Sequence, residues 1–252
     1  METPTSADRL VLLGTGTCQL EPDRKATAAL VELEGSRIVF DLGRGIADRL
    51  VEVGLRQDDV EHLVLSHFHP DHLSDLVPYL HAAAWSRIDP RTRDLHIYGP
   101  LGLESQLMRI LGLFGPDTLR REHFRVHLHE VRGEALEIAG RRFEYPDLPP
   151  AGNHGLGFTT ALGRVVLTGD SSFHDSEIAF LRDAALAVID SGHLEDDEIV
   201  ELAVASGAQR ILCSHLYRPI DGEALTQRAR GRGYRGTISE AQDLQVEPLG
   251  GA

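Results

Sequence analysis

Ten consecutive residues, 66–75, constrain this chain more than any other stretch. They run Ser-His-Phe-His-Pro-Asp-His-Leu-Ser-Asp and place four potential metal ligands within six positions: His67, His69, Asp71 and His72. The apolar run Leu63-Val64-Leu65 precedes them and predicts a short buried strand, and 73–84 has the pattern of an amphipathic helix. The sequence therefore predicts a strand-to-helix turn that carries imidazole and carboxylate groups.

The spacing of these four side chains allows two cations to be held. His67 and His69 are two residues apart, so they point the same way in an extended segment. Asp71 and His72 follow where the helix begins and the backbone changes direction. One metal ion can take the first pair and a second ion the other. Imidazole with carboxylate suits zinc, manganese or iron better than calcium. A polar surface turn is the alternative, but no packing role needs four such groups together.

Composition places the chain among globular proteins. Its 252 residues are 42% hydrophobic, which fits one sizeable domain or two small ones, and we expect a single domain over 1–252. No apolar run is long enough to span a membrane, and residues 1–9 lack the apolar centre of a signal peptide. Cys18 and Cys213 are too few for a disulfide framework, as a reducing compartment permits. These features predict a cytoplasmic protein with no membrane partner.

The charge of the chain bears on its partners. The formal net charge is −14 with the histidines neutral. Long-range attraction to a polyanion is weak at that balance, and bound divalent cations would offset only part of it. We therefore expect a small substrate and no large nucleic-acid partner.

Apolar runs and turn residues divide the chain into strands and helices that alternate in two halves, with loops rich in His and Asp at strand ends. This order predicts an α/β protein with two sheets packed face to face and helices outside. Gly45, before a predicted helix, offers a weak phosphate site. The predicted strands are 9–14, 28–34, 37–41, 60–66, 95–99, 124–130, 134–138, 141–145, 156–162, 164–168, 185–190 and 209–213, with 237–246 as a strand or irregular segment. The predicted helices are 46–54, 73–84, 101–112, 175–182, 196–206 and 222–230.

Three further potential metal ligands follow the 66–75 turn in the order His, Asp, His. His154 comes after a loop rich in Pro and Gly, Asp170 lies in Thr-Gly-Asp, and His215 lies in Cys-Ser-His. Asp170 and His215 each follow an apolar strand. The His-x-His-x-Asp-His turn followed by His, Asp and His resembles the ligand pattern of the metallo-β-lactamase superfamily.

Other segments resemble the ribonuclease Z branch of that superfamily, which includes small-molecule phosphodiesterases. They are Leu-Leu-Gly-Thr-Gly-Thr at 12–17, Phe-Asp-Leu-Gly-Arg-Gly at 40–45 and the 66–75 turn. Gly192-His193, before a predicted helix, resembles an additional catalytic histidine of that branch. The chain lacks the glycine- and lysine-rich arm of tRNA-processing members, and its 170–193 segment is shorter and lacks their His-Glu pair. These departures argue against tRNA processing.

The resemblance implies the αββα four-layer sandwich of the metallo-β-lactamase fold, two divalent ions, zinc or manganese, and a possible homodimer. The shared water between the ions would become the nucleophile, oriented by Asp71, and His193 would stabilise charge or protonate the leaving oxygen. The implied metal ligands are His67, His69 and His154 for the first ion, Asp71, His72 and His215 for the second, and Asp170 between them.

The leading hypothesis is therefore a metal-dependent phosphodiesterase acting on a small or cyclic nucleotide-like phosphodiester. Three alternatives stay open: hydrolysis of a lactone, thioester or β-lactam on the same centre, tRNA 3′ processing, and a non-catalytic metal-binding member. The remaining histidines are interpreted as ordinary surface residues, on a solvated strand face in the case of His127 and His129. They are His62, His81, His96, His123, His127, His129 and His174. Cys213 is expected in the core, and the arginines of 228–235 at a solvated helix end.

Overall fold

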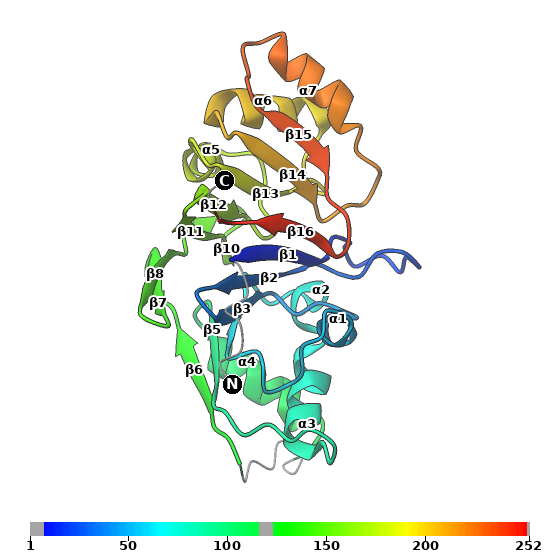
Figure 1. Ribbon diagram of the computed structural model, residues 1–252, viewed down its shortest axis with the longest axis vertical. Coiled ribbons are helices and arrows are strands. Elements are labelled where there is room, and N and C mark those ends of the chain that lie inside the picture. The colour runs from blue at the N-terminus through cyan, green and yellow to red at the C-terminus, as the bar shows by residue number, and fades with distance from the viewer. Residues whose placement is uncertain (1–7, 116–122, 251–252) are drawn as a thin grey trace.

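The computed structural model describes residues 8–115 and 123–250 (Figure 1). Most of the polar segment 1–9, for which we expected no signal peptide, therefore lies outside the described residues. Two seven-stranded sheets form the middle of the molecule, and helices lie on their outer sides. Within the described ranges, no helix is long and apolar enough to cross a bilayer.

The first sheet is built mainly from the N-terminal half. Its strands, in spatial order, are β16 (Gln245–Pro248), β1 (Arg9–Gly14), β2 (Ala28–Leu33), β3 (Ser36–Phe40), β4 (His62–Val64), β5 (Leu95–Gly99) and β6 (Val126–Glu130). The helices of this half are α1 (Ile46–Glu52), α2 (Pro70–Leu73), α3 (Leu76–Trp85) and α4 (Leu103–Gly112). Strands β3 to β6 are parallel neighbours, so the chain must cross back over the sheet between them.

The second sheet is built from the C-terminal half. Its order is β15 (Thr237–Glu240), β14 (Arg210–Ser214), β13 (Leu186–Asp190), β12 (Gly163–Leu167), β11 (Leu156–Thr160), β8 (Arg141–Glu144) and β7 (Ala135–Ile138). The helices α5 (Asp175–Leu181), α6 (Asp196–Ser206) and α7 (Gly222–Arg230) cover its outer face. A short hairpin of β9 (Asp147–Leu148) and β10 (Asn153–His154) interrupts the predicted loop before β11.

Three apolar cores separate the four layers, and alternation along the strands assigns residues to them. In β1, Leu10 and Leu12 belong to the core between the sheets, whereas Val11 and Leu13 face the helices of the first half. In β14, Leu212 faces the other sheet and Cys213 packs under the helices of the second half. The period of two in each strand thus produces two buried faces, and the expected αββα sandwich is confirmed.

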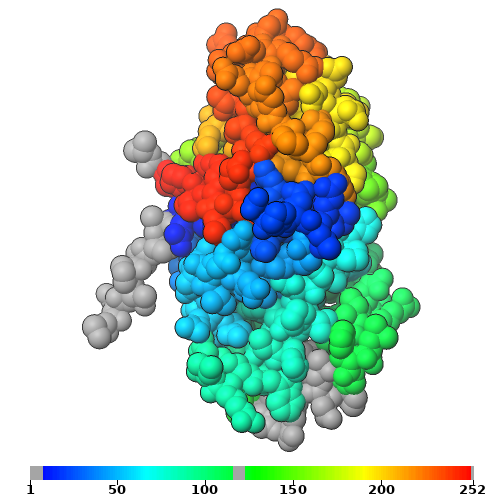
Figure 2. Space-filling view, turned by 90° about the vertical axis from the view of Figure 1, so that its right-hand side faces the viewer, coloured from blue at the N-terminus to red at the C-terminus, as the bar shows by residue number. Residues whose placement is uncertain are grey.

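The main differences from the expected elements lie at two places. The helix predicted over 73–84 begins later, at Leu76, because Pro70 opens a separate short helix, α2, at the ligand turn and α3 starts only after Asp75. The segment 237–246 is neither one strand nor irregular. It holds β15 in the second sheet and the start of β16 in the first, and β16 pairs with β1. Figure 2 shows the blue N-terminal and red C-terminal segments meeting on one face.

The parallel strands of both sheets end on the same side of the sandwich. Asp41 follows β3, the 66–75 turn follows β4, Asp170 follows β12 and His215 follows β14. The carboxyl ends of parallel strands are where loops can bring side chains from distant segments together. The functional side chains predicted from the sequence lie at this edge. That residues 1–252 form one domain stays a prediction.

Candidate metal centre

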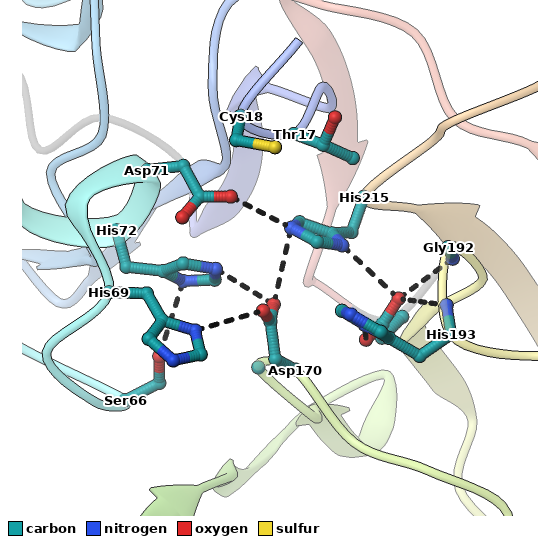
Figure 3. Close-up of polar contacts among 12 residues, drawn as sticks. Thr17, Cys18, Ser66, His69, Asp71, His72, Asp170, Gly192, His193 and His215 are labelled. Atoms are coloured by element: carbon teal, nitrogen blue, oxygen red, sulfur yellow. Dashed lines mark hydrogen bonds and ion pairs between the residues drawn. The ribbon is translucent and has the colours of Figure 1, made fainter.

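Asp170 lies among four histidines, and Figure 3 shows three of them, His69, His72 and His215, around its carboxylate. One carboxylate oxygen, Oδ1, lies 2.7 Å from His72 Nε2 and 3.3 Å from His215 Nε2. The other oxygen, Oδ2, lies 3.6 Å from His67 Nε2 and 3.9 Å from His69 Nδ1. Each oxygen of Asp170 therefore faces a different pair of imidazoles, which is the arrangement that a bridging carboxylate requires.

The backbone around Asp170 is fixed by a buried asparagine from the β9–β10 hairpin. The Asp170 amide donates to Asn153 Oδ1 at 3.0 Å, and Asn153 Nδ2 donates to the Thr168 carbonyl at 3.1 Å. Gly169 has a positive φ of 65°, and a Cβ there would lie 2.5 Å from Asn153 Oδ1. Only glycine fits this close approach, which explains the Thr-Gly-Asp sequence.

A buried aspartate from the end of β3 orients His72. Asp41 Oδ2 lies 2.7 Å from His72 Nδ1, so the other ring nitrogen, Nε2, faces Asp170. The Ser66 amide and hydroxyl donate to the two oxygens of Asp41 at 2.7 and 2.8 Å. Asp41 itself has a positive φ of 63°, a strained conformation for a residue with a side chain. Such outer carboxylates fix the ring orientation of metal-binding histidines.

Asp190 plays the corresponding part at the end of β13. Its Oδ1 accepts the amides of Gly192 and His193 at 2.8 and 3.2 Å, and lies 3.3 Å from His215 Nδ1. Its Oδ2 lies 2.6 Å from His193 Nδ1. One buried carboxylate therefore holds both His215, whose Nε2 faces Asp71 and Asp170, and His193 beside it.

The electrostatics of the cluster favour positive charge. Burial alone would lower the pKa of His72, but the charges of Asp41 and Asp170 outweigh it and raise the pKa to about 10. Burial likewise opposes protonation of His215, yet Asp190 and Asp71 raise its pKa to about 9. The pKa of Asp170 is lowered, because contact with His72 outweighs the burial that would raise it. The carboxylates that raise the pKa values of His72 and His215 would also stabilise bound cations.

Unpartnered buried atoms show that the side chains fit a metal centre. Five such atoms lie in the predicted ligand set: His67 Nε2, His72 Nε2, His154 Nδ1, Asp170 Oδ1, and His215 Nδ1, which lies 3.3 Å from Asp190 Oδ1. Although His72 Nε2 and Asp170 Oδ1 are only 2.7 Å apart, their alignment does not form a hydrogen bond. Buried polar atoms without partners are costly, and bound cations would satisfy them.

Two of the groups in which ligand atoms lie together each contain three of the residues predicted for one ion. His67, His69 and Asp170 form one, and Asp71, His72 and His215 form the other, with the ligand atoms of each group within 4.8 Å of one another. A third group joins Asp170 and His215 to the pair of Asp190 and His193. The 2.6 Å contact between Asp190 Oδ2 and His193 Nδ1 is a hydrogen bond.

His154 lies next to the cluster but outside both groups. Its amide donates to the Ser66 carbonyl at 3.0 Å, and its ring stacks on Tyr145 at a centroid distance of 4.4 Å. The Nδ1 atom is buried without a partner. Its role as a ligand of the first ion stays a prediction. His193 is half-exposed, and the hydrogen bond that its Nδ1 donates to Asp190 raises its pKa against the effect of burial.

Sequence reasoning missed Asp41 and Asp190 as parts of the site. Both end apolar strands, and Asp190 stands three residues before His193, so their strand-end position was the available signal.

The phosphate site at Gly45 was wrong, because the Asp75 carboxylate accepts the Ala47 amide at 2.9 Å and fills the start of α1. At the end of α7, Arg228 and Arg232 pair with acidic residues of α6, away from the cluster.

Comparison with known proteins places this geometry in a family. The family model described as "Metallo-beta-lactamase superfamily" matches residues 22–215. Among curated proteins, the ribonuclease Z of Pyrococcus abyssi is 31% identical over 129 residues, 50% of this chain and 39% of that protein. The ribonuclease Z of Streptococcus pneumoniae is 32% identical over 127 residues, 49% of this chain and 40% of that protein. The match thus spans well under half the length of these relatives.

Solved structures share the fold over nearly the whole chain. The metallo-β-lactamase-fold protein YhfI of Bacillus subtilis superposes with a TM-score of 0.77 at 20% identity, covering 96% of this chain and 99% of that one. A diphosphatase of the PhnP family gives 0.73 at 20% identity, covering 95% and 97%. The short form of human tRNase Z gives 0.70 at 19% identity, covering 96% and 99%. At such identities these likenesses show a common fold.

Proposed function

Because this chain belongs to the metallo-β-lactamase superfamily, we propose that it is a phosphodiesterase with a dinuclear metal centre, acting on a small or cyclic nucleotide-like phosphodiester. The family and its ribonuclease Z and diphosphatase relatives indicate a metal-dependent hydrolase. The observation that carries the choice of a phosphodiester is His193, which Asp190 holds beside His215 where a leaving oxygen needs a proton.

Seven side chains would hold the two divalent ions, zinc or manganese. When bound, such a pair lowers the pKa of a water molecule and stabilises charge on the phosphoryl oxygens. In this proposal His67, His69 and His154 hold the first ion, Asp71, His72 and His215 hold the second, and Asp170 is shared.

The chain's own groups would supply the remaining steps. Asp71, partly exposed and 3.4 Å from His215, would orient the attacking water by accepting its hydrogen bond. Asp190 binds His193 through Nδ1, which leaves Nε2 to donate a proton to the leaving oxygen. The raised pKa of His193 keeps that proton available near neutral pH. Asp41 would keep His72 aimed at its ion.

The charge of the chain supports a small substrate. A net charge of −14 disfavours a long polyanion, and two arginines near α7, Arg228 and Arg232, are paired with acidic residues of α6. The proposal therefore places the recognition of the substrate at the strand ends rather than along an extended basic surface.

The experiment is hydrolysis of bis(p-nitrophenyl) phosphate by protein loaded with Mn²⁺ or Zn²⁺. His193→Ala should lower kcat by about 10²–10⁴-fold, the usual contribution of a positioned proton donor, with the bound metal unchanged. His81→Ala removes an exposed histidine of α3 and should leave the rate unchanged. Failure to cleave the diester, with cleavage of a lactone, thioester or β-lactam instead, would favour acyl hydrolysis and overturn the proposal.

Cleavage of RNA is the second candidate function. It is favoured by the 31–32% identity to ribonuclease Z proteins over half of this chain. A precursor tRNA with a 3′ trailer tests it directly. Cleavage at rates well above those for mononucleotide diesters would replace the small-substrate proposal with an RNA-processing one.

A further inference from the structure

Tyr217 stands at the mouth of the metal centre, two residues after His215. Its ring meets that of His215 at a centroid distance of 5.6 Å and an angle of 89°. It meets the ring of His193 at 6.0 Å and 80°. Some 37% of Tyr217 is exposed, so an aromatic ring borders the two imidazoles and also faces solvent.

Contacts from three directions hold Tyr217 in place. Its hydroxyl lies 3.4 Å from Cys18 Sγ. Figure 3 shows Cys18 on the far side of Asp71 and His215 from Asp170. A Cβ on Gly192 would lie 2.7 Å from Tyr217 Cδ2, so only glycine allows the ring to pack against this loop. The neighbouring Leu216 amide donates to the Thr15 carbonyl at 2.9 Å.

The next residue secures the other end of the same loop. Arg218 Nη2 donates to Asp196 Oδ1 at the start of α6 at 2.6 Å. His215 at the beginning of the loop has a positive φ of 53°, which the surrounding contacts maintain. The ring is therefore ordered before a ligand arrives, and binding against it costs little additional side-chain entropy.

We propose that Tyr217 stacks on the base of a nucleoside phosphodiester and so selects nucleotide esters over simple alkyl esters. The inference rests on the proposed function and names its substrate class. A chain with a net charge of −14 gains little from long-range attraction to a phosphate, so contacts with the base would add affinity beyond what the bound ions supply. Stacking on an aromatic ring provides it, and because every base has a planar face it works for any base.

Two chromogenic substrates separate recognition of the base from the chemistry. Thymidine 5′-(p-nitrophenyl) phosphate and methyl p-nitrophenyl phosphate release the same leaving group, so they differ only in the nucleoside. The metal-loaded wild type should prefer the thymidine ester in kcat/KM. Tyr217→Leu, which keeps an apolar side chain without a ring, should reduce that preference about 5- to 100-fold, mainly through KM. Tyr217→Phe keeps the ring and should retain the preference.

The controls distinguish this inference from the function on which it rests. Equal losses on both esters in Tyr217→Leu, or an unchanged preference, would overturn the stacking role. Thermal unfolding followed by circular dichroism verifies that both variants fold. If the wild type cleaves neither ester, the proposed function fails. In that case, calorimetric binding of thymidine 5′-phosphate to metal-loaded protein tests the stacking role of Tyr217 by itself. Weaker binding to Tyr217→Leu than to Tyr217→Phe supports stacking, and equal binding refutes it.

Discussion

Strand β4 begins with one histidine and is followed by another, and the two belong to very different clusters. His67 follows its carboxyl end and lies among the carboxylates of the metal centre. His62 begins the strand and lies in what we call the histidine stack. The members of the stack are His62, His96, Tyr98, His127 and His129, from β4, β5 and β6.

The histidine stack differs from the solvated strand face expected for His127 and His129. Both side chains are half-buried, and the rings of His96 and His127 stack at 4.7 Å. His127 also pairs with Asp94 at 2.8 Å, a partner that lies far away in the sequence. Parallel pairing of β5 with β6 places these residues in register, which local sequence patterns do not reveal.

The orientation of the ring nitrogens explains why only one cluster is suited to metal. In the stack, His96 Nδ1 and His129 Nε2 are 3.0 Å apart and their ring centroids 5.3 Å apart. The difference equals about twice the distance from a ring centre to its nitrogen, so the nitrogens point straight at each other, as an N–H···N bond requires. In the metal centre, carboxylates hold the second nitrogen of His72 and His215, and the remaining nitrogens converge on Asp170. The convergence of ring nitrogens on a central carboxylate, Asp170, rather than the number of histidines, distinguishes the two clusters.

The largest effect should come from removing the central carboxylate. Asp170→Asn keeps the size of the side chain but removes the negative charge shared by both ligand groups. Metal affinity should fall by more than about 100-fold, beyond the loss caused by removing an outer partner, and diesterase activity should fall with it. Elemental analysis after dialysis measures the bound metal. His129→Ala, in the stack, should keep full metal content, and an equal loss in that variant would contradict the distinction between the clusters.

A smaller effect is expected from an outer carboxylate. Asp41→Asn weakens the hold on His72 Nδ1 without touching a predicted ligand position, so metal affinity should fall about 10- to 100-fold. Competition with a fluorescent chelator gives the affinity. Asp94→Asn is the matched control, since it removes the carboxylate partner of His127 in the stack. If both variants bind metal as well as the wild type, Asp41 does not act through His72.

The smallest effect concerns acid stability. Burial, reinforced by the neighbouring His96, lowers the pKa of His62 from 6.5 to about 4. Between these values the unfolded chain binds a proton that the folded protein does not, so stability falls as the pH falls through this window. The free energy of unfolding changes by at most about 1.4 kcal/mol per pH unit, and the total loss of stability across the window is about 1–3 kcal/mol.

Replacement of that histidine tests the effect. Between pH 7 and pH 5, the His62→Phe variant should lose less free energy of unfolding than the wild type does. The variant lacks the group that gains a proton on unfolding. Urea unfolding at the two pH values gives the difference in free energy. The same loss on acidification in both proteins would show that His62 does not couple folding to protonation.

The sequence predicted the metal centre better than the histidine stack for a physical reason. The ligands of the metal centre lie at strand ends, where loops carry polar residues out of apolar runs, as with Asp170 after 163–167. The stack lies inside three strands, and its contacts depend on the register between β5 and β6, which many different sequences permit. Asp41 and Asp190 were missed because a single aspartate at a strand end is common, and His72 and His215, which they contact, lie 31 and 25 residues away. The contact of Asp190 with His193, three residues on, was the nearer signal.

The division of the last segment between two sheets has a consequence for synthesis of the protein. Strand β16 is the neighbour of β1, although more than 230 residues separate them, and Asp243 before it binds the Thr15 amide and hydroxyl at 2.9 and 2.8 Å. While the chain emerges from the ribosome, β1 has an open edge, and the loop that carries Cys18 lacks its anchor. The first half therefore completes its sheet last, and a chain cut short before residue 243 should expose that edge to other unfinished chains.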